Sequence, residues 1–144
     1  GLSNRRAFEQ ALEVRLGAAL PEPFSVIMLD VDGLKQVNDA RGHAAGDPVL
    51  KRVASVLTAH LRETDVVTRW GGDEFVLLMP GMDQVGAVSL ARRVGGTLRD
   101  ADDSAGAISV SIGTASFPAD ATTADGLLAA ADRSMYIDKR QRVA

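Results

Sequence analysis

Two short acidic segments of the sequence carry the residue types that bind divalent cations. Asp30 and Asp32 follow an apolar run that begins at Phe24, and Asp73 and Glu74 follow a pair of glycines. Carboxylates held close together repel one another unless a cation lies between them. Mg²⁺ prefers oxygen ligands, usually one or two carboxylates together with substrate phosphates and water. The acids therefore predict a metal site that neutralises charge on a phosphoryl group and lowers the pKa of an attacking hydroxyl.

The pattern of apolar and helix-breaking residues predicts the elements around these acids. Helices are expected over residues 3–20, 34–40, 48–61, 84–99 and 122–137, and strands over 24–29, 65–70, 74–79 and 107–117. Asp47 occupies the expected N-cap position of the third helix. This order contains a βαββαβ core, which is typical of an α+β, ferredoxin-like fold with helices packed on one face of a mostly antiparallel sheet.

This topology predicts how the acids meet. The first strand and the hairpin strands are neighbours in such a sheet, so Asp30 or Asp32 should converge with Asp73 or Glu74 near one edge. Other interpretations remain open from the residues alone. Acids after a strand are also typical of a turn, and acids in a hairpin are also typical of solvated surface charge.

Gly71 and Gly72 join the two predicted hairpin strands. A glycine pair between strands favours a tight turn, because both turn residues can adopt positive φ. Without side chains, these residues also let a ligand or another backbone segment come close. The pair is therefore compatible with a simple turn and with a surface on which a purine or a triphosphate lies.

Composition narrows the class of protein. The 144 residues fit one domain, and the net charge of −3 argues against a general binder of nucleic-acid polymers. The absence of cysteine removes disulfides, thiolate zinc sites and cysteine nucleophiles. No stretch reaches the roughly 18 apolar residues that span a bilayer, and no signal peptide is visible. We expect a cytoplasmic domain, 1–144, without membrane contact of its own.

The sequence starts at Gly1 rather than Met. We therefore expect it to be part of a longer signalling protein, in which upstream segments could carry a sensor or a membrane anchor.

Several ordered motifs extend along nearly the whole chain. The longest are Asp30-Val31-Asp32-x-x-Lys35-x-x-Asn38-Asp39-x-x-Gly42-His43-x-x-Gly46-Asp47 and Arg69-x-Gly71-Gly72-Asp73-Glu74-Phe75. Shorter ones are Gly1-Leu2-x-Asn4-Arg5-Arg6-x-Phe8, Ser111-Ile112-Gly113-x-Ala115 and Ala131-Asp132-x-x-Met135-Tyr136-x-x-Lys139. Together they resemble the signature of GGDEF-family diguanylate cyclases. The resemblance implies the fold of nucleotide-cyclase and polymerase palm domains.

The resemblance assigns roles to the acids. It implies that Mg²⁺, or Mn²⁺ in its place, is held by Asp30, the backbone carbonyl of Val31, and Asp73. It also implies that Asp73 is the base that takes the proton from the ribose 3′-hydroxyl. Glu74, the fourth residue of the motif, is implied to be needed for activity.

Substrate contacts are implied in the same way. Asn38 and Asp47 match the positions that bind guanine in the family. Their chemistry agrees with this role, because an amide can donate to O6 or N3 and a carboxylate can accept from N1–H and N2–H₂. The edge of adenine presents the opposite pattern. The residues implied to contact the rest of the GTP substrate are His43, Lys35, Lys139, Gly71 and Gly72.

The implied reaction condenses two GTP molecules into cyclic di-GMP with loss of two pyrophosphates. Each domain binds one GTP, so a homodimer with twofold symmetry is the expected active form. Arg62-Glu63-Thr64-Asp65 matches the family's RxxD product-inhibition site, with Arg93 as a further expected contact. From the residues alone, Arg62 and Asp65 are also compatible with a surface ion pair of little consequence.

Two other functions remain compatible with the sequence. A catalytically silent GGDEF-like module would bind GTP or cyclic di-GMP as a receptor, although the presence of all the metal acids favours the enzyme. A metal-dependent nucleotidyl transferase with another substrate would lack the preference for GTP over ATP. The chain departs from the family pattern at Leu34, commonly phenylalanine, and at Asp138, usually alanine, and its tail after Lys139 lacks the usual Gly-Arg-Asn.

Overall fold

The elements follow the predicted order in the computed structural model, which describes residues 4–42, 44, 46–100 and 107–143. The helices are α1 (Arg5–Leu16), α2 (Leu34–Arg41), α3 (Asp47–His60), α4 (Gln84–Arg99) and α5 (Ala124–Val143). The strands are β1 (Phe24–Val31), β2 (Val66–Arg69), β3 (Glu74–Pro80) and β4 (Val110–Phe117). The predicted βαββαβ core is confirmed.

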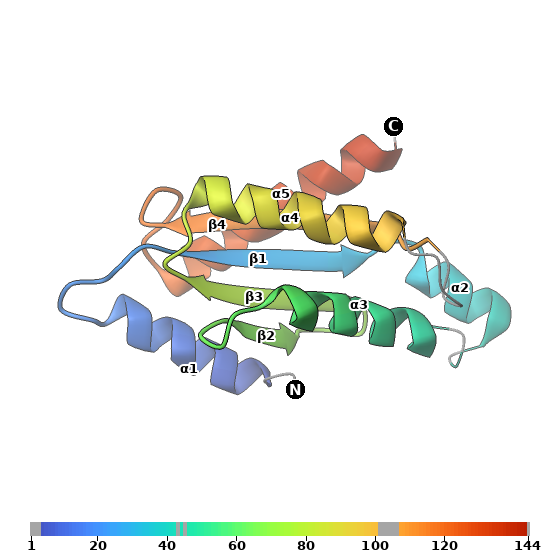
Figure 1. The fold of residues 1–144 in the computed structure, drawn as a ribbon, viewed down its shortest axis with the longest axis horizontal. Helices are drawn as coiled ribbons and strands as arrows, with labels where there is room; N and C mark the ends of the chain where they lie inside the picture. Colours follow the sequence, from blue (N-terminus) through green and yellow to red (C-terminus); the bar gives the residue numbers. More distant parts are fainter. Residues whose placement is uncertain (1–3, 43, 45, 101–106, 144) are drawn as a thin grey trace.

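The strands form one antiparallel sheet in the order β2-β3-β1-β4 (Figure 1). β1 lies in the middle and is buried along its whole length, between β3 and β4. Its last residues are paired on both sides, because Asp30 lies opposite Glu74 of β3 and opposite Ser111 of β4. The strand register therefore places the first acidic segment directly beside the second.

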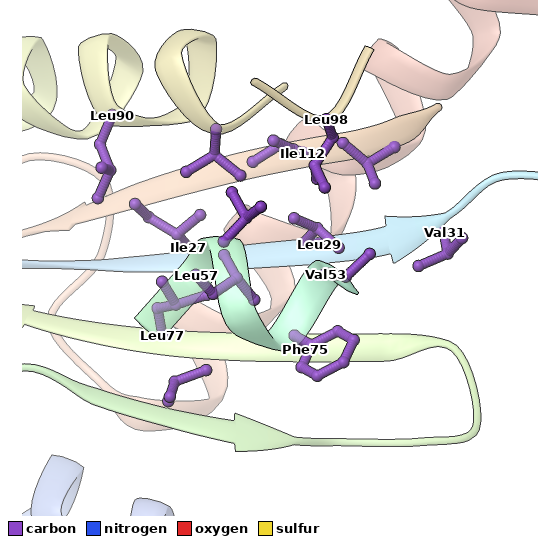
Figure 2. Close-up of a cluster of buried hydrophobic side chains, with 14 of the residues drawn as sticks. Ile27, Leu29, Val31, Val53, Leu57, Phe75, Leu77, Leu90, Leu98 and Ile112 are labelled. Atoms are coloured by element: carbon purple, nitrogen blue, oxygen red, sulfur yellow. The ribbon is translucent and has the colours of Figure 1, made fainter. Parts of the chain in front are cut away.

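Helices cover both faces of this sheet, so the prediction of helices on one face is wrong. Successive side chains of a strand point to opposite faces, and β1 is apolar in both sets. Ile27 and Leu29 pack with α3 and α4 on one face, as Figure 2 shows, while Val26 and Met28 pack with α1 and α5 on the other. The residues that the helices contribute are Val53, Leu57, Leu90 and Leu98 on the first face and Phe8, Leu12, Leu127 and Ala131 on the second.

Helix boundaries differ from the prediction where capping decides them. α1 begins at Arg5 because the Asn4 side chain accepts a hydrogen bond from the backbone of Ala7 at 2.8 Å. It ends at Leu16, four residues before the predicted end, and Leu20 is exposed. Asp47 is the first residue of α3 rather than its N-cap, a position that Gly46 occupies without a side-chain hydrogen bond.

No helix in the described part of the chain combines the length and the apolar character needed to cross a membrane.

The close packing of α5 on the sheet depends on a glycine. A Cβ atom on Gly113 of β4 would overlap the carbonyl oxygen of Ala131 and the backbone nitrogen of Met135. Because both are backbone atoms, no side-chain rotation could relieve the overlap. Gly113 therefore sets how near α5, the helix that carries Lys139, can lie to β4.

Replacing Gly113 with alanine is expected to push α5 away from β4 and to lower the free energy of unfolding by about 3 kcal/mol or more, at the upper end of overpacking effects. Gly96→Ala is the matched control, because a Cβ atom there would meet nothing within 4 Å. Gly96 lies inside α4, where alanine should stabilise by about 0.5–1 kcal/mol. Urea denaturation measures both effects, and equal stabilities of the two variants would contradict this account of the packing.

Candidate active site

The two acidic segments meet at the end of β1. The backbone N–H of Val31 donates to the carbonyl oxygen of Asp73 at 3.0 Å, directly beyond the Asp30–Glu74 pair of the sheet. This contact fixes the turn between β2 and β3 against β1. α2 and the beginning of α3 lie at the same end of the sheet (Figure 1). The predicted convergence of the two segments is therefore present in the fold.

Arg69, a residue without a predicted role, holds the turn that carries Asp73. Its guanidinium donates to the carbonyl oxygens of Gly71 at 3.3 Å and Gly72 at 2.7 Å. The backbone N–H of Trp70 donates to the carbonyl oxygen of Glu74 at 2.8 Å and closes the turn from within. In the sequence, the only signal for the contacts of Arg69 is its place in the motif, two residues before Gly71.

The backbone conformation of the turn does not require glycine at either of its two glycine positions. Neither has positive φ, so the predicted glycine turn with two positive φ values is wrong, although the hairpin itself is present. A Cβ atom on Gly72 would meet nothing within 4 Å, and one on Gly71 would meet only Glu74 Oε2, at 3.7 Å. Neither conformation nor packing within the described chain requires glycine here, which leaves an open surface for a ligand.

Asp30 is the central acid of the site. Asp30 is only 8% exposed. Burial and the charge of Asp73 raise the pKa of its carboxyl group from 3.8 to about 6, against the opposing effect of Lys139. Oδ2 accepts a hydrogen bond from Lys139 Nζ at 3.3 Å. Oδ1 is buried and has no hydrogen-bond partner among the described residues. One oxygen of a carboxylate near a second carboxylate is thus left for a cation.

Asp32 has a different role from Asp30, a distinction that the residues and the topology alone left open. Its two carboxylate oxygens accept hydrogen bonds from the hydroxyls of Ser109 and Ser111, each at 2.7 Å. Its backbone N–H donates to the carbonyl oxygen of Ser109 at 2.9 Å. Asp32 therefore ties the end of β1 to β4 and the residue before it, and Asp30 is the acid that faces Asp73.

The chemistry of these donors fits Mg²⁺ bound together with a substrate. No cluster of three or more acidic or histidine side chains with the spacing of a metal site occurs within residues 4–42, 44, 46–100 and 107–143. Mg²⁺ is commonly held by only one or two carboxylates, with phosphate and water oxygens completing its shell. Asp30 and Asp73, with the Val31 carbonyl beside them, match this requirement.

Glu74 lies half-buried at the start of β3, beside the acid pair. Burial and the charges of Asp73 and Asp132 raise its pKa, against the opposing effects of Arg5 and Lys139. Lys139 compensates part of this negative charge, and its hydrogen bond to Asp30 raises the pKa of its ammonium group. The site therefore holds several acids and the cation that stabilises them.

A pocket of about 500 Å³ opens beside Asp30 along α5. Lys139 and Arg133 contribute positive charge to its wall, and Tyr136 and Ile137 are more than half exposed. The predicted phosphate contact Lys139 thus lies between the acid pair and an open pocket. The other predicted lysine contact, the side chain of Lys35, lies outside the described part of the structure, as does His43.

The predicted guanine contacts lie on the two helices that follow β1. Asn38 is half-buried on α2, and Asp47 is exposed at the first position of α3. The side chain of Asn38 lies against Gly46, the residue that directly precedes Asp47. The connection between α2 and α3 therefore brings the amide and the carboxylate to the same region.

A family model described as "Diguanylate cyclase, GGDEF domain" matches residues 1–143. The chain belongs to this family. The diguanylate cyclase TpbB of Pseudomonas aeruginosa is 42% identical over 147 residues, which cover 97% of this chain and 34% of TpbB. The bifunctional diguanylate cyclase/cyclic di-GMP phosphodiesterase MucR of the same organism is 37% identical, over 97% of this chain and 21% of MucR. This GGDEF domain thus spans about a third or less of these curated relatives.

Solved structures show the same fold. The GGDEF domain of Pseudomonas aeruginosa TpbB superposes with a TM-score of 0.88 at 39% identity, covering 98% of this chain and 92% of that one. The GGDEF domain of DgcB from Caulobacter crescentus, solved in complex with c-di-GMP, superposes with a TM-score of 0.82 at 27% identity, over 97% of this chain and 86% of that one. The palm-like α+β fold expected from the resemblance is confirmed.

The predicted RxxD site of this GGDEF domain lies at the opposite end of β3. Arg62 donates through Nε and a terminal nitrogen to the two carboxylate oxygens of Asp65, at 3.2 and 2.9 Å, and to the carbonyl oxygen of Pro80 at 2.8 Å. The Asp65 side chain is fully buried, and both residues line a pocket of about 430 Å³. Pro80 and Glu74 are the two ends of β3, about 20 Å apart at the rise of a strand. Arg93 lies exposed on α4.

In metal-free buffer, Asp30 is expected to make this GGDEF domain less stable as the pH rises. Because its pKa is about 6 in the folded state and 3.8 ordinarily, the folded state binds the proton more tightly, and the free energy of unfolding falls through this window. Asp30→Asn lacks the ionisation. Its stability relative to the parent should rise by about 1–3 kcal/mol between about pH 4 and pH 7.5 in urea denaturation. A difference that does not change with pH would contradict the raised pKa.

Proposed function

We propose that this domain condenses two GTP molecules into cyclic di-GMP and two pyrophosphates in a reaction that depends on Mg²⁺. The observation that supports this most strongly is the meeting of Asp30 and Asp73 in a GGDEF-family domain, with Asp30 Oδ1 buried and unpartnered among the described residues. Mg²⁺ held by these carboxylates and the Val31 carbonyl would neutralise charge on the reacting phosphoryl group. Without such a cation, the buried acids repel one another.

Each residue of the site has a distinct part in the proposed reaction. Asp73 accepts the proton of the ribose 3′-hydroxyl that attacks the phosphoryl group of the second GTP. Lys139, which lies beside Asp30, balances the phosphate charge, and Lys35 is proposed to do the same. Glu74 adds a second carboxylate next to Asp73. Rate acceleration in this scheme comes from positioning and from charge stabilisation in a desolvated site.

The guanine base is proposed to lie against Asn38 and Asp47. An amide N–H donates to the guanine O6, and a carboxylate accepts from N1–H and N2–H₂. His43 is proposed as a further substrate contact, and the open surface above Gly71 and Gly72 leaves room for the nucleotide. These groups would give selectivity for GTP over ATP.

The proposed reaction needs two copies of the domain. Each copy offers one set of acids and one guanine site, whereas the product contains two guanosine units joined by two phosphodiester bonds. A twofold arrangement lets the 3′-hydroxyl on each copy face the phosphoryl group on the other. The active species is therefore proposed to be a homodimer.

Product inhibition is proposed to act through Arg62 and Asp65. The buried Asp65 carboxylate holds the guanidinium in a fixed orientation beside a pocket, and an arginine fork can bind a phosphate or a guanine edge. Arg93 is proposed as a second contact. In an activity assay, added cyclic di-GMP should slow the parent and leave Arg62→Ala unaffected; equal slowing of both would contradict the assignment.

The decisive experiment incubates the domain, fused to a dimeric coiled coil, with GTP and Mg²⁺ and identifies the products by mass. The parent is expected to form cyclic di-GMP, and Asp73→Asn is expected to form at least a thousandfold less, because both a metal ligand and the base are lost. The coiled coil removes dimerisation as a reason for failure.

The control for this assay is binding of the same two nucleotides. A dimerised parent that binds GTP or cyclic di-GMP without turnover would contradict the enzyme and support the receptor function. ATP as an equally good substrate would contradict the guanine assignment and favour a different nucleotidyl transferase.

A further inference from the structure

Gly46 is a glycine for which its own backbone gives no reason. Its φ of −81° and ψ of −19° lie in the right-handed helical region, which any residue can adopt. It is the N-cap of α3, a position where serine, threonine, aspartate and asparagine are favoured as well as glycine. Gly46 is also buried. The requirement for glycine must therefore come from what packs against it.

Two side chains of α2 lie against the α-carbon of Gly46. Leu34 and Asn38 are four residues apart and share one face of this helix. A Cβ atom on Gly46 would lie 2.5 Å from Asn38 Oδ1, 3.2 Å from Asn38 Cγ and 3.0 Å from Leu34 Cδ1. All three distances are below ordinary van der Waals contact. Because Leu34 is buried in the core, the Asn38 amide is the group that would have to move.

This contact decides which end of the Asn38 amide can meet a ligand. Asn38 Oδ1 is buried against the α-carbon of Gly46, which occupies the space beside it. The remaining polar atom of the side chain is Nδ2, which only donates hydrogen bonds. A donor that meets the O6 acceptor of guanine finds no acceptor in adenine, which carries an amino group at the equivalent position.

We infer that Gly46 is a positioning residue, which fixes the Asn38 amide beside Asp47 so that it distinguishes guanine from adenine. The inference rests on the proposed function, because it takes GTP as the ligand of Asn38 and Asp47. A side chain at position 46 displaces the amide, and the site loses selectivity while the sheet and its two cores remain intact. Gly46 thus acts through Asn38 and needs no contact with the nucleotide.

A double-mutant cycle tests the inference. The parent, Gly46→Ala, Asn38→Ala and the double variant are titrated calorimetrically with non-hydrolysable analogues of GTP and ATP in the presence of Mg²⁺. Gly46→Ala should weaken binding of the GTP analogue about tenfold, the loss expected for one hydrogen bond, with little change for the ATP analogue. The double variant should bind no more weakly than Asn38→Ala, because the displaced amide is already absent. Gly96→Ala, a glycine with open space around its α-carbon, should bind as the parent does.

Each outcome separates the inference from the proposed function. The inference is overturned, and the proposed function stands, if Gly46→Ala binds the GTP analogue as tightly as the parent does. The same conclusion follows if the affinity losses of the two single variants multiply in the double variant. Failure of the parent to prefer the GTP analogue would overturn the guanine assignment and the inference with it. If Gly46→Ala also lowers the unfolding midpoint, Asn38→Ala should restore part of the loss; no restoration would contradict the contact itself.

Discussion

The Asp30 carboxylate must carry its charge at the end of a strand that is buried along its whole length, and the rest of the site is arranged around this constraint. Burial and the nearby Asp73 both oppose ionisation. Lys139 counters them from α5, so the helix has to lie close to β1, and Gly113 allows this approach. A bound cation would remove the remaining repulsion. The same acids that lower the stability of the empty site would therefore bind the metal.

Much of this could be predicted from the sequence, because the signals were local or topological. The apolar run before Asp30, the hairpin that carries Asp73, and the βαββαβ order together indicated that the two acidic segments meet. The topology alone could not decide between Asp30 and Asp32, and only the family resemblance favoured Asp30. The choice depends on the hydroxyls of Ser109 and Ser111, nearly eighty residues away, and on a sheet register that no local pattern specifies.

Other differences between the predictions and the structure also have physical causes. Both faces of β1 are apolar, yet a continuous apolar run does not say which helices cover each face. The Gly71-Gly72 pair favours positive φ and is also compatible with an open surface, and the structure has open space there without positive φ. Gly46 carried no predicted role of its own, because the contact that requires glycine comes from α2. At Gly46 the reason lies in the side chains that pack against the backbone rather than in the conformation of the residue.

Asp30 and Asp73, and not Asp32, are proposed to hold the divalent cation. The most direct test of this assignment is an electron paramagnetic resonance titration of Mn²⁺, used in place of Mg²⁺, with a non-hydrolysable GTP analogue bound. The account predicts that Asp30→Asn and Asp73→Asn each weaken Mn²⁺ binding about tenfold or more, while Asp32→Asn, whose carboxylate is engaged by two serines, binds as the parent does. Unchanged binding by Asp30→Asn, or an equal loss in Asp32→Asn, would contradict it.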